Sequence, residues 1–148
     1  VGTSLVENTV FQIQSLLKNK NLILPSDVEV AKGSKYRVVK PDGVLVDEAI
    51  VDVGPQTIEK LKELIQKSKF ILWNGPLGKY EIGFGGSTES VLKMISKSSA
   101  HSIIGGGDTV AVVSKLKLEN KLGFVSTGGG ATLDFLVKGT LPGIKVLK

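Results

Sequence analysis

The sequence predicts an α/β protein with a doubly wound parallel sheet, in the three-layer α/β/α arrangement of Rossmann-like folds. Short apolar runs alternate with helical patterns through the second half of the chain. Two of these runs, ending near Ile104 and Val125, lead through three glycines directly into a helix. Consecutive strands of such a chain are usually neighbours, so both glycine loops are expected at the carboxyl edge of one sheet.

The composition is that of an ordinary globular domain. The 148 residues are 41% hydrophobic and 22% charged, which suffices for one domain with a core. The formal net charge is +5, but the lysines are dispersed without interleaved aromatics, so we expect no nucleic-acid partner. Cysteine is absent, which excludes disulfides and thiol catalysis and fits a reducing cytosol. With no apolar run of membrane-spanning length and no signal peptide, we expect a cytoplasmic protein without a membrane partner.

The first elements are a helix and an extended segment. Ser4 and Glu7 have the spacing of a capping box, and apolar residues at helical spacing follow them as far as Leu17. Residues 22–24 are expected to form a buried strand that Pro25 stops, with extended chain resuming soon afterwards.

A small hairpin is expected over residues 36–46, around the turn signal Pro41-Asp42-Gly43. Residues 50–53 read as another strand, ended by Gly54-Pro55. A helix then begins at Thr57, with apolar residues on its inward face.

A regular alternation of strand and helix begins at residues 70–73, which read as a buried strand. The following helix starts near Thr88, and the long connection before it contains Asn74, Pro76 and Glu81. A loop of this length and composition could wall an adenine and hold a ribose. The alternative is a glycine-rich lid without a specific ligand.

The first glycine loop, Gly105-Gly106-Gly107, leaves backbone N–H groups bare at the start of a helix that Asp108 or Thr109 would cap. Such a nest of donors, with the positive end of the helix dipole behind it, binds phosphates. Asp108 would then lie within reach of a Mg²⁺ ion carried by the phosphate. The alternative is a tight strand-to-helix turn with an aspartate cap.

The second loop, Gly128-Gly129-Gly130, repeats the same plan before a helix that Gly139 stops. One loop could hold a nucleotide and the other the opposing reactant. Neither loop is a standard P-loop, and the dinucleotide pattern G-x-G-x-x-G fails at Val110 and at Leu133.

Four motifs together strongly resemble phosphoglycerate kinase in order and spacing. They are Trp73-Asn74-Gly75-Pro76-Leu77-Gly78-Lys79-Tyr80-Glu81, Gly105-Gly106-Gly107-Asp108-Thr109, Ser126-Thr127-Gly128-Gly129-Gly130-Ala131 and Leu141-Pro142-Gly143. Shorter matches, Gly2-x-Ser4-Leu5-x-Glu7, Leu24-Pro25-x-Asp27 and Asp52-x-Gly54-Pro55, extend the resemblance to nearly the whole chain.

The resemblance implies the nucleotide-binding, carboxyl-terminal domain of a two-domain enzyme that transfers a phosphoryl group between 1,3-bisphosphoglycerate and Mg-ADP. It makes Asp108 the ligand of nucleotide-bound Mg²⁺ and Glu81 the ligand of the ribose hydroxyls. The further nucleotide-binding residues that it implies are Gly105, Gly106, Gly107 and Thr109 around the phosphates, and Asn74, Pro76, Val51 and Lys79 near the base or sugar. The residues that it places next to the transferred group are Gly107, Gly128, Gly129 and Gly130.

The chain also departs from the family pattern. Lys79 stands where the family commonly has an aliphatic residue. Ser87-Thr88 replaces Gly-Thr, which keeps Thr88 as the expected cap of the following helix. In the family, the domain that binds 3-phosphoglycerate, a catalytic arginine and a glycine-lysine motif precede the position of Gly2. Residues 1–148 are therefore expected to be an incomplete nucleotide-binding domain, truncated on its amino-terminal side.

Such a chain is expected to be inactive alone, and to self-associate through an open sheet edge or to depend on a companion fragment. The alternative from another class is a non-catalytic nucleotide-binding or folding module. A dinucleotide-dependent oxidoreductase is disfavoured, because both glycine loops fail its pattern.

Overall fold

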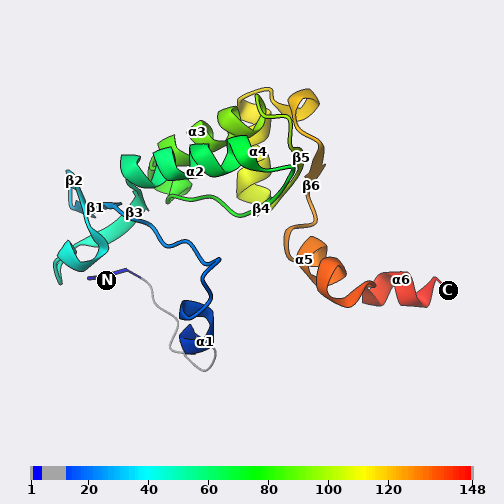
Figure 1. The fold of residues 1–148 in the computed structure, drawn as a ribbon, viewed down its shortest axis with the longest axis horizontal. Coiled ribbons are helices and arrows are strands. Elements are labelled where there is room, and N and C mark those ends of the chain that lie inside the picture. Colours follow the sequence, from blue (N-terminus) through cyan, green and yellow to red (C-terminus); the bar gives the residue numbers. More distant parts are fainter. Residues whose placement is uncertain (1, 5–12, 148) are drawn as a thin grey trace. The chain divides into compact units, whose positions relative to one another are not determined.

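The computed structural model describes residues 2–4 and 13–147 (Figure 1). The chain divides into two compact units, residues 1–58 and residues 59–148, with the boundary inside helix α2. The first unit holds α1 (Ile13–Leu17), β1 (Val28–Lys32), β2 (Lys35–Val39), η1 (Pro41–Gly43), β3 (Ala49–Val53) and the start of α2 (Pro55–Lys67). The second holds β4 (Phe70–Asn74), η2 (Tyr80–Ile82), α3 (Gly86–Ile95), β5 (His101–Gly105), α4 (Gly107–Lys115), η3 (Glu119–Lys121), β6 (Phe124–Ser126), α5 (Gly129–Lys138) and α6 (Pro142–Val146). None of the helices that the structure describes is long and apolar enough to cross a membrane.

The first unit is built on an antiparallel sheet of order β2-β1-β3. β1 and β2 form a hairpin in which Lys32 faces Lys35, and Gly33 supplies the left-handed backbone of the turn with φ +57°. β1 pairs with β3 on its other side. Apolar side chains of β1 and β3 form the small core of this unit: Val28, Val30 and Val51.

The hairpin expected over residues 36–46 was wrong in its second strand. β2 pairs with the preceding strand β1, and residues 44–46 form no strand. The turn signal Pro41-Asp42-Gly43 closes a 3₁₀ turn instead, with the Gly43 N–H donating to the Lys40 carbonyl at 2.9 Å. A two-residue turn with glycine at positive φ matches the twist of antiparallel strands, which favours pairing across Gly33.

The strand expected at residues 22–24 was also wrong. These residues lie outside any strand, and Leu22, Ile23 and Leu24 are exposed. Of the helix expected after Ser4, α1 covers Ile13–Leu17, and residues 5–12 lie outside the described residues. The Ser4 hydroxyl accepts a hydrogen bond from the Ile50 N–H at 2.8 Å, which ties the described segment of residues 2–4 to β3.

Helix α2 begins against a buried carboxylate. Asp27 is 2% exposed, and its two oxygens accept hydrogen bonds from the N–H groups of Gln56 at 3.0 Å and Thr57 at 2.8 Å. The Thr57 hydroxyl donates to the same carboxylate at 2.7 Å. A Cβ atom on Gly54 would collide with this carboxylate. Two of the short motifs in the sequence, around Asp27 and around Gly54, therefore meet in one helix cap.

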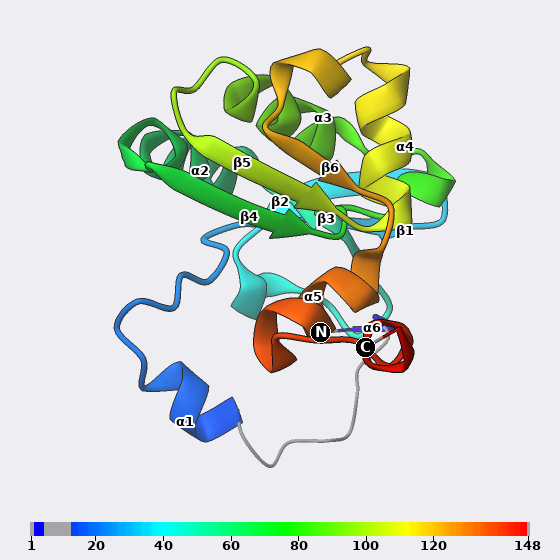
Figure 2. The same cartoon turned by 90° about the vertical axis from the view of Figure 1, so that its right-hand side faces the viewer.

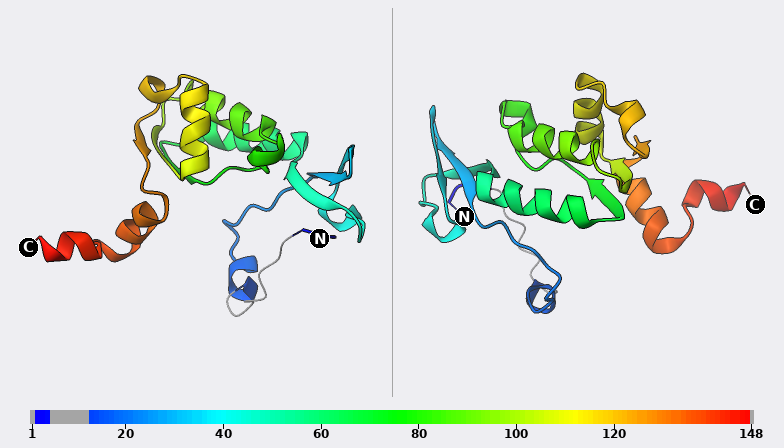
Figure 3. Two further views of the ribbon diagram at one scale, coloured as in Figure 1. Left: turned by 180° about the vertical axis from the view of Figure 1, so that it is seen from behind. Right: turned by 45° about the horizontal axis from the view of Figure 1, so that its top comes forward.

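The second unit contains the predicted parallel sheet, in the order β4-β5-β6 (Figure 2). Helices α3 and α4 lie side by side against it, as the views in Figures 2 and 3 show. Their buried side chains and those of β5 form the core: Thr88, Val91, Leu92, Ile95, Ser102, Ile104, Thr109, Val112 and Val113. The α/β fold class predicted from the alternating pattern is confirmed.

Strand β4 was expected to be buried, and this is wrong for one of its two faces. Its exposure alternates along the strand, with Phe70 at 58% and Leu72 at 43%, and Phe124 of β6 is 59% exposed. The register places Phe70 and Leu72 on the face opposite to Ile71 and Trp73. None of the described residues of α5 or α6 is buried.

Candidate functional site

The carboxyl ends of the three parallel strands lie at one level. Asn74 of β4 pairs with Gly105 of β5, which pairs with Ser126 of β6. The Gly75 N–H donates to the Gly105 carbonyl at 3.3 Å, so the chain is held together just beyond the strand ends. The loops after β4, β5 and β6 therefore open at the same edge, as the glycine patterns predicted.

These three loops lie in contact with one another, and a Cβ atom would be crowded at Gly105 and Gly106. A Cβ atom on Gly105 would lie 2.5 Å from Asn74 Oδ1, so the asparagine carboxamide rests on this glycine. Gly106 has φ +90°, and a Cβ there would lie 3.0 Å from the Gly75 nitrogen. A Cβ on Gly129 would lie 3.6 Å from Gly106 Cα, which is van der Waals contact. The structure thus brings Asn74 and both glycine loops together.

The first glycine loop leads into a helix that has no side-chain cap. Helix α4 begins at Gly107 with Gly106 as its N-cap, so the expected cap by Asp108 or Thr109 was wrong. The first intrahelical bond runs from the Val110 N–H to the Gly106 carbonyl at 2.9 Å. The three N–H groups before Val110 have no acceptor within the helix and carry the positive end of its dipole. An anion placed there would receive several N–H groups at once.

Two side chains follow directly in this first turn. Thr109 is fully buried, and its hydroxyl has no hydrogen-bond partner among the described residues. Asp108 is exposed, and the described residues contain no cluster of three side chains suited to hold a metal ion. A single exposed carboxylate beside an anion site fits a Mg²⁺ ion that arrives with nucleotide phosphates, because Mg²⁺ takes one or two carboxylates plus phosphate oxygens and water.

In the second glycine loop, one backbone N–H group is hydrogen-bonded within the loop itself. The Gly128 N–H donates to Ser126 Oγ at 3.2 Å, and the same hydroxyl lies 2.5 Å from Thr132 Oγ1. Helix α5 then starts at Gly129, whose φ of +39° favours glycine. The N–H groups of Gly129 and Gly130 stand in the first turn, where a helix offers no acceptor. These two glycines, more than Gly128, have N–H groups to offer to a ligand.

The long loop between β4 and α3 carries residues that were predicted to bind the sugar and base of a nucleotide. Glu81 lies in η2, and its exposed carboxylate makes no hydrogen bond or ion pair with any other described residue. Lys79 is exposed as well, whereas Pro76 is half-buried. The loop is anchored where the Leu77 N–H donates to the hydroxyl of the fully buried Thr88 at 3.0 Å.

Thr88 was expected to cap α3, and Val51 was expected to lie near the base or sugar of a nucleotide. Thr88 does not cap α3, which begins at Gly86 with Gly85 as N-cap; its hydroxyl is used by Leu77 instead. Val51 lies in β3 of the first unit and is 3% exposed. Its predicted contact with a base or sugar stays a prediction.

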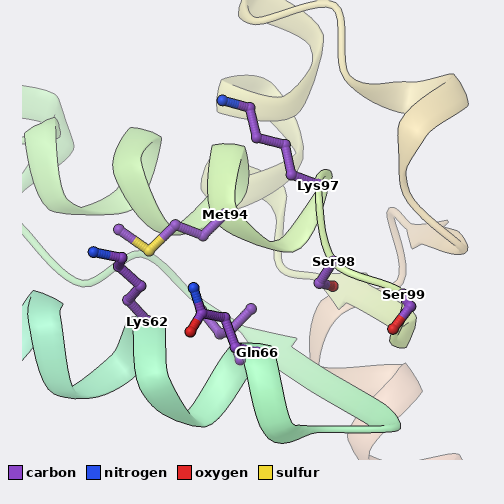
Figure 4. A pocket seen from close by; sticks show the side chains of 7 residues that line it. Lys62, Gln66, Met94, Lys97, Ser98 and Ser99 are labelled. Atoms are coloured by element: carbon purple, nitrogen blue, oxygen red, sulfur yellow. The ribbon is translucent and has the colours of Figure 1, made fainter.

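A pocket of about 480 Å³ lies elsewhere in the second unit, between α2 and the end of α3 (Figure 4). Its lining includes Lys62, Gln66, Met94 and Lys97. Because α3 runs from the carboxyl edge of the sheet back to the amino edge, this pocket is at the end of α3 remote from the glycine loops. Lys97 follows the last turn of α3, where a lysine interacts favourably with the carbonyl end of a helix.

One cluster beside the long loop could not be predicted from local sequence patterns. The Lys115 ammonium lies 3.0 Å from the Glu89 carboxylate and 5.5 Å from the centre of the Tyr80 ring. Glu89 and Lys115 are 26 positions apart in the sequence, so no local spacing could pair them.

Known phosphoglycerate kinases match this chain in sequence. A family model described as phosphoglycerate kinase matches residues 1–139. The phosphoglycerate kinase of Buchnera aphidicola subsp. Acyrthosiphon pisum is 39% identical over 154 residues, which cover 100% of this chain and 40% of that protein. That of Coxiella burnetii is 40% identical over 158 residues, covering 99% of this chain and 40% of that protein.

Solved structures of this family share the fold. The structure of phosphoglycerate kinase from Coxiella burnetii matches with a TM-score of 0.86, covering 99% of this chain and 41% of its own. Phosphoglycerate kinase from Pyrococcus horikoshii matches with a TM-score of 0.71 at 33% identity, covering 83% of this chain and 31% of its own. The chain thus spans about 40% of the length of the curated relatives it matches. Because the family model extends over residues 1–139, the chain belongs to the phosphoglycerate kinase family.

Proposed function

We propose that residues 1–148 supply the nucleotide-binding part of a glycolytic phosphoglycerate kinase, which transfers a phosphoryl group between 1,3-bisphosphoglycerate and Mg-ADP. The observation that carries this proposal is the meeting of Asn74 with two glycine-rich helix starts at one sheet edge. In this proposal 3-phosphoglycerate and 1,3-bisphosphoglycerate are held by residues outside this chain, since the chain spans about 40% of its relatives. A cytosolic setting, expected from the absence of cysteine, is part of the same proposal.

The chain's own residues would act mainly by positioning charge. The N–H groups at the start of α4 would hold the nucleotide phosphates, and those of Gly129 and Gly130 would face the group in transfer. Asp108 would hold the Mg²⁺ that travels with the nucleotide, and Glu81 would fix the ribose. Mg²⁺, when bound, neutralises charge on the phosphate oxygens. Phosphoryl transfer depends on positioning and on charge stabilisation rather than on covalent chemistry, which suits this set of groups.

The proposal is tested by calorimetric titration of the chain with ADP, with and without Mg²⁺. We expect Mg²⁺ to strengthen ADP binding by roughly tenfold, and Asp108→Ala to abolish that gain, because a carboxylate ligand of the metal is lost. Asp42→Ala, which removes an exposed carboxylate in the first unit, is the matched control and should leave the Mg²⁺ effect unchanged.

The outcomes separate the alternatives. An Asp108→Ala variant that binds Mg-ADP as well as the unaltered chain would contradict the role of Asp108. No ADP binding by a chain shown to be folded would contradict the nucleotide-binding assignment and favour the folding module.

The partner proposal is that this chain self-associates or pairs with a companion fragment through the open sheet. β4 is one of the two edge strands of the described parallel sheet, and its side chains Phe70 and Leu72 are exposed. Exposed edges of this kind pair readily with other chains. Sedimentation velocity should show species larger than 15.7 kDa, and Leu72→Lys should reduce them. Ile82→Lys, which changes an exposed apolar residue in η2 away from the sheet, should not. A monodisperse monomer would contradict self-association.

A further inference from the structure

Tyr80 lies at the centre of contacts that join the loop of residues 75–85 to α3 and α4. The aromatic ring rests against Gly85, where a Cβ atom would collide with it. The Lys115 ammonium, at the last residue of α4, lies 5.5 Å from the ring centre, within the range of cation–π attraction. We propose that Tyr80, Lys115 and Glu89 form a clamp that positions Glu81 for the nucleotide, an inference that rests on the function proposed above.

Glu89 of α3 holds the lysine in place. Its Oε1 lies 3.0 Å from Lys115 Nζ, and its Oε2 lies 3.5 Å from Lys93 Nζ. The hydrogen bond from Lys115 is the largest influence on Glu89 and lowers the pKa of its carboxyl. The same bond, followed by the Tyr80 hydroxyl, raises the pKa of Lys115. Both partners thus keep their charges at neutral pH, and the ammonium is shared between the carboxylate and the ring.

Fixing Tyr80 also fixes the backbone of the next residue, Glu81. Both belong to η2, in which the Gly83 N–H donates to the Tyr80 carbonyl at 3.0 Å and the Phe84 N–H donates to the Lys79 carbonyl at 3.1 Å. The Glu81 carboxylate makes no hydrogen bond or ion pair within the described part of the chain. The anchoring residue and the residue free to meet a ligand are therefore adjacent.

The clamp also connects two parts of the candidate site. Helix α4 starts at Gly107, beside the phosphate-facing N–H groups, and ends at Lys115. With nine residues, α4 is a rigid spacer between its two ends. Through Lys115, the loop that carries Glu81 is tied to the same helix that carries Asp108, so the sugar ligand and the metal ligand keep a fixed separation.

The clamp is tested first without any ligand, by hydrogen exchange of the amides of Ile82, Gly83 and Phe84. Lys115→Met keeps the length of the side chain but removes its charge, and should speed exchange about fivefold, the effect expected of one exposed cation–π contact and one ion pair. Lys115→Arg keeps the charge and should restore slow exchange. Lys93→Met is the matched control, since Lys93 contacts the same carboxylate at 3.5 Å from another helix turn.

The positioning role is tested by ADP affinity in the same variants. Lys115→Met should weaken ADP binding about fivefold, whereas Lys115→Arg and Lys93→Met should bind as the unaltered chain does. Unchanged hydrogen exchange in Lys115→Met would overturn the clamp. Faster exchange with unchanged ADP affinity would overturn the positioning role. If the unaltered chain binds no ADP, the proposed function fails and the positioning role with it, while the exchange rates still decide whether the clamp exists.

Discussion

The purified chain, given ATP, Mg²⁺ and 3-phosphoglycerate, is expected to form ADP at least about a thousandfold more slowly than a full-length relative. We expect this because the chain offers no arginine that could stabilise the phosphoryl group in transfer. Arg37 is the one arginine of the sequence, and its guanidinium donates to both Glu48 oxygens at 2.7 and 2.8 Å. This bond is the largest influence on Glu48 and lowers the pKa of its carboxyl. An arginine that stabilises a phosphoryl group in transfer is worth roughly 10³–10⁵ in rate. The one arginine of this chain is already engaged by Glu48.

A coupled assay for ADP, with the Coxiella burnetii enzyme as positive control, measures the difference. Arg37→Lys should leave the residual rate unchanged, because the Arg37 guanidinium is engaged by Glu48 and by the Gly43 carbonyl. Turnover within tenfold of the relative would contradict the expectation. If the amino-terminal remainder of that relative, expressed separately, raises the rate when added, the companion-fragment proposal gains support; no rise would count against it.

The parts of the site that follow from local chemistry could be predicted from the sequence. A strand that runs through glycines into a helix leaves few backbone solutions, and the positive φ angles of Gly106 and Gly129 are the reason for glycine there. Because parallel strands in register end at one edge, finding both loops also predicted that they would meet. The close approach of Gly105 to Asn74 follows from the same register.

The parts that depend on distant partners could not be predicted in this way. The strand segment at residues 36–39 was found, but its partner was not, because pairing with β1 depends on the turn at Gly33 rather than on the apolar pattern. Threonine is a residue type that often caps helices. The Thr88 hydroxyl instead accepts a hydrogen bond from the N–H of Leu77, eleven positions earlier. The contact between Tyr80 and Lys115 likewise joins residues that no periodicity relates.

The apolar run at residues 22–24 shows a different limit. Its sequence is that of a buried strand, but a strand is stabilised only when another strand pairs with it and a core covers it. In the described structure these residues have neither, and all three side chains are exposed. The apolar pattern therefore predicts a tendency to be buried, while the partner that would bury the segment decides the outcome.

Asp27→Ala is expected to lower the free energy of unfolding of the first unit by about 2–4 kcal/mol. The carboxylate is 2% exposed and accepts hydrogen bonds from two N–H groups at the start of α2 and from the Thr57 hydroxyl. Its removal leaves buried donors without an acceptor, which costs more than the loss of a surface contact. Urea denaturation followed by far-ultraviolet circular dichroism measures the change. Asp42→Ala, at an exposed carboxyl of the same unit, should change the stability by less than about 0.5 kcal/mol.

The pH dependence of the stability shows whether Asp27 stabilises α2 through its charge or through packing alone. Burial raises the pKa of Asp27, but the hydrogen bonds from Gln56 and Thr57 outweigh it and hold the pKa below the ordinary value of 3.8. A carboxyl whose pKa is lower in the folded state contributes its full stabilisation above the unfolded value and loses it as the pH falls through the folded one. The stability gap between the unaltered chain and Asp27→Asn, which keeps the shape without the charge, should therefore be full near neutral pH and narrow below about pH 4. A gap independent of pH would mean that Asp27 stabilises α2 by its shape rather than by its charge.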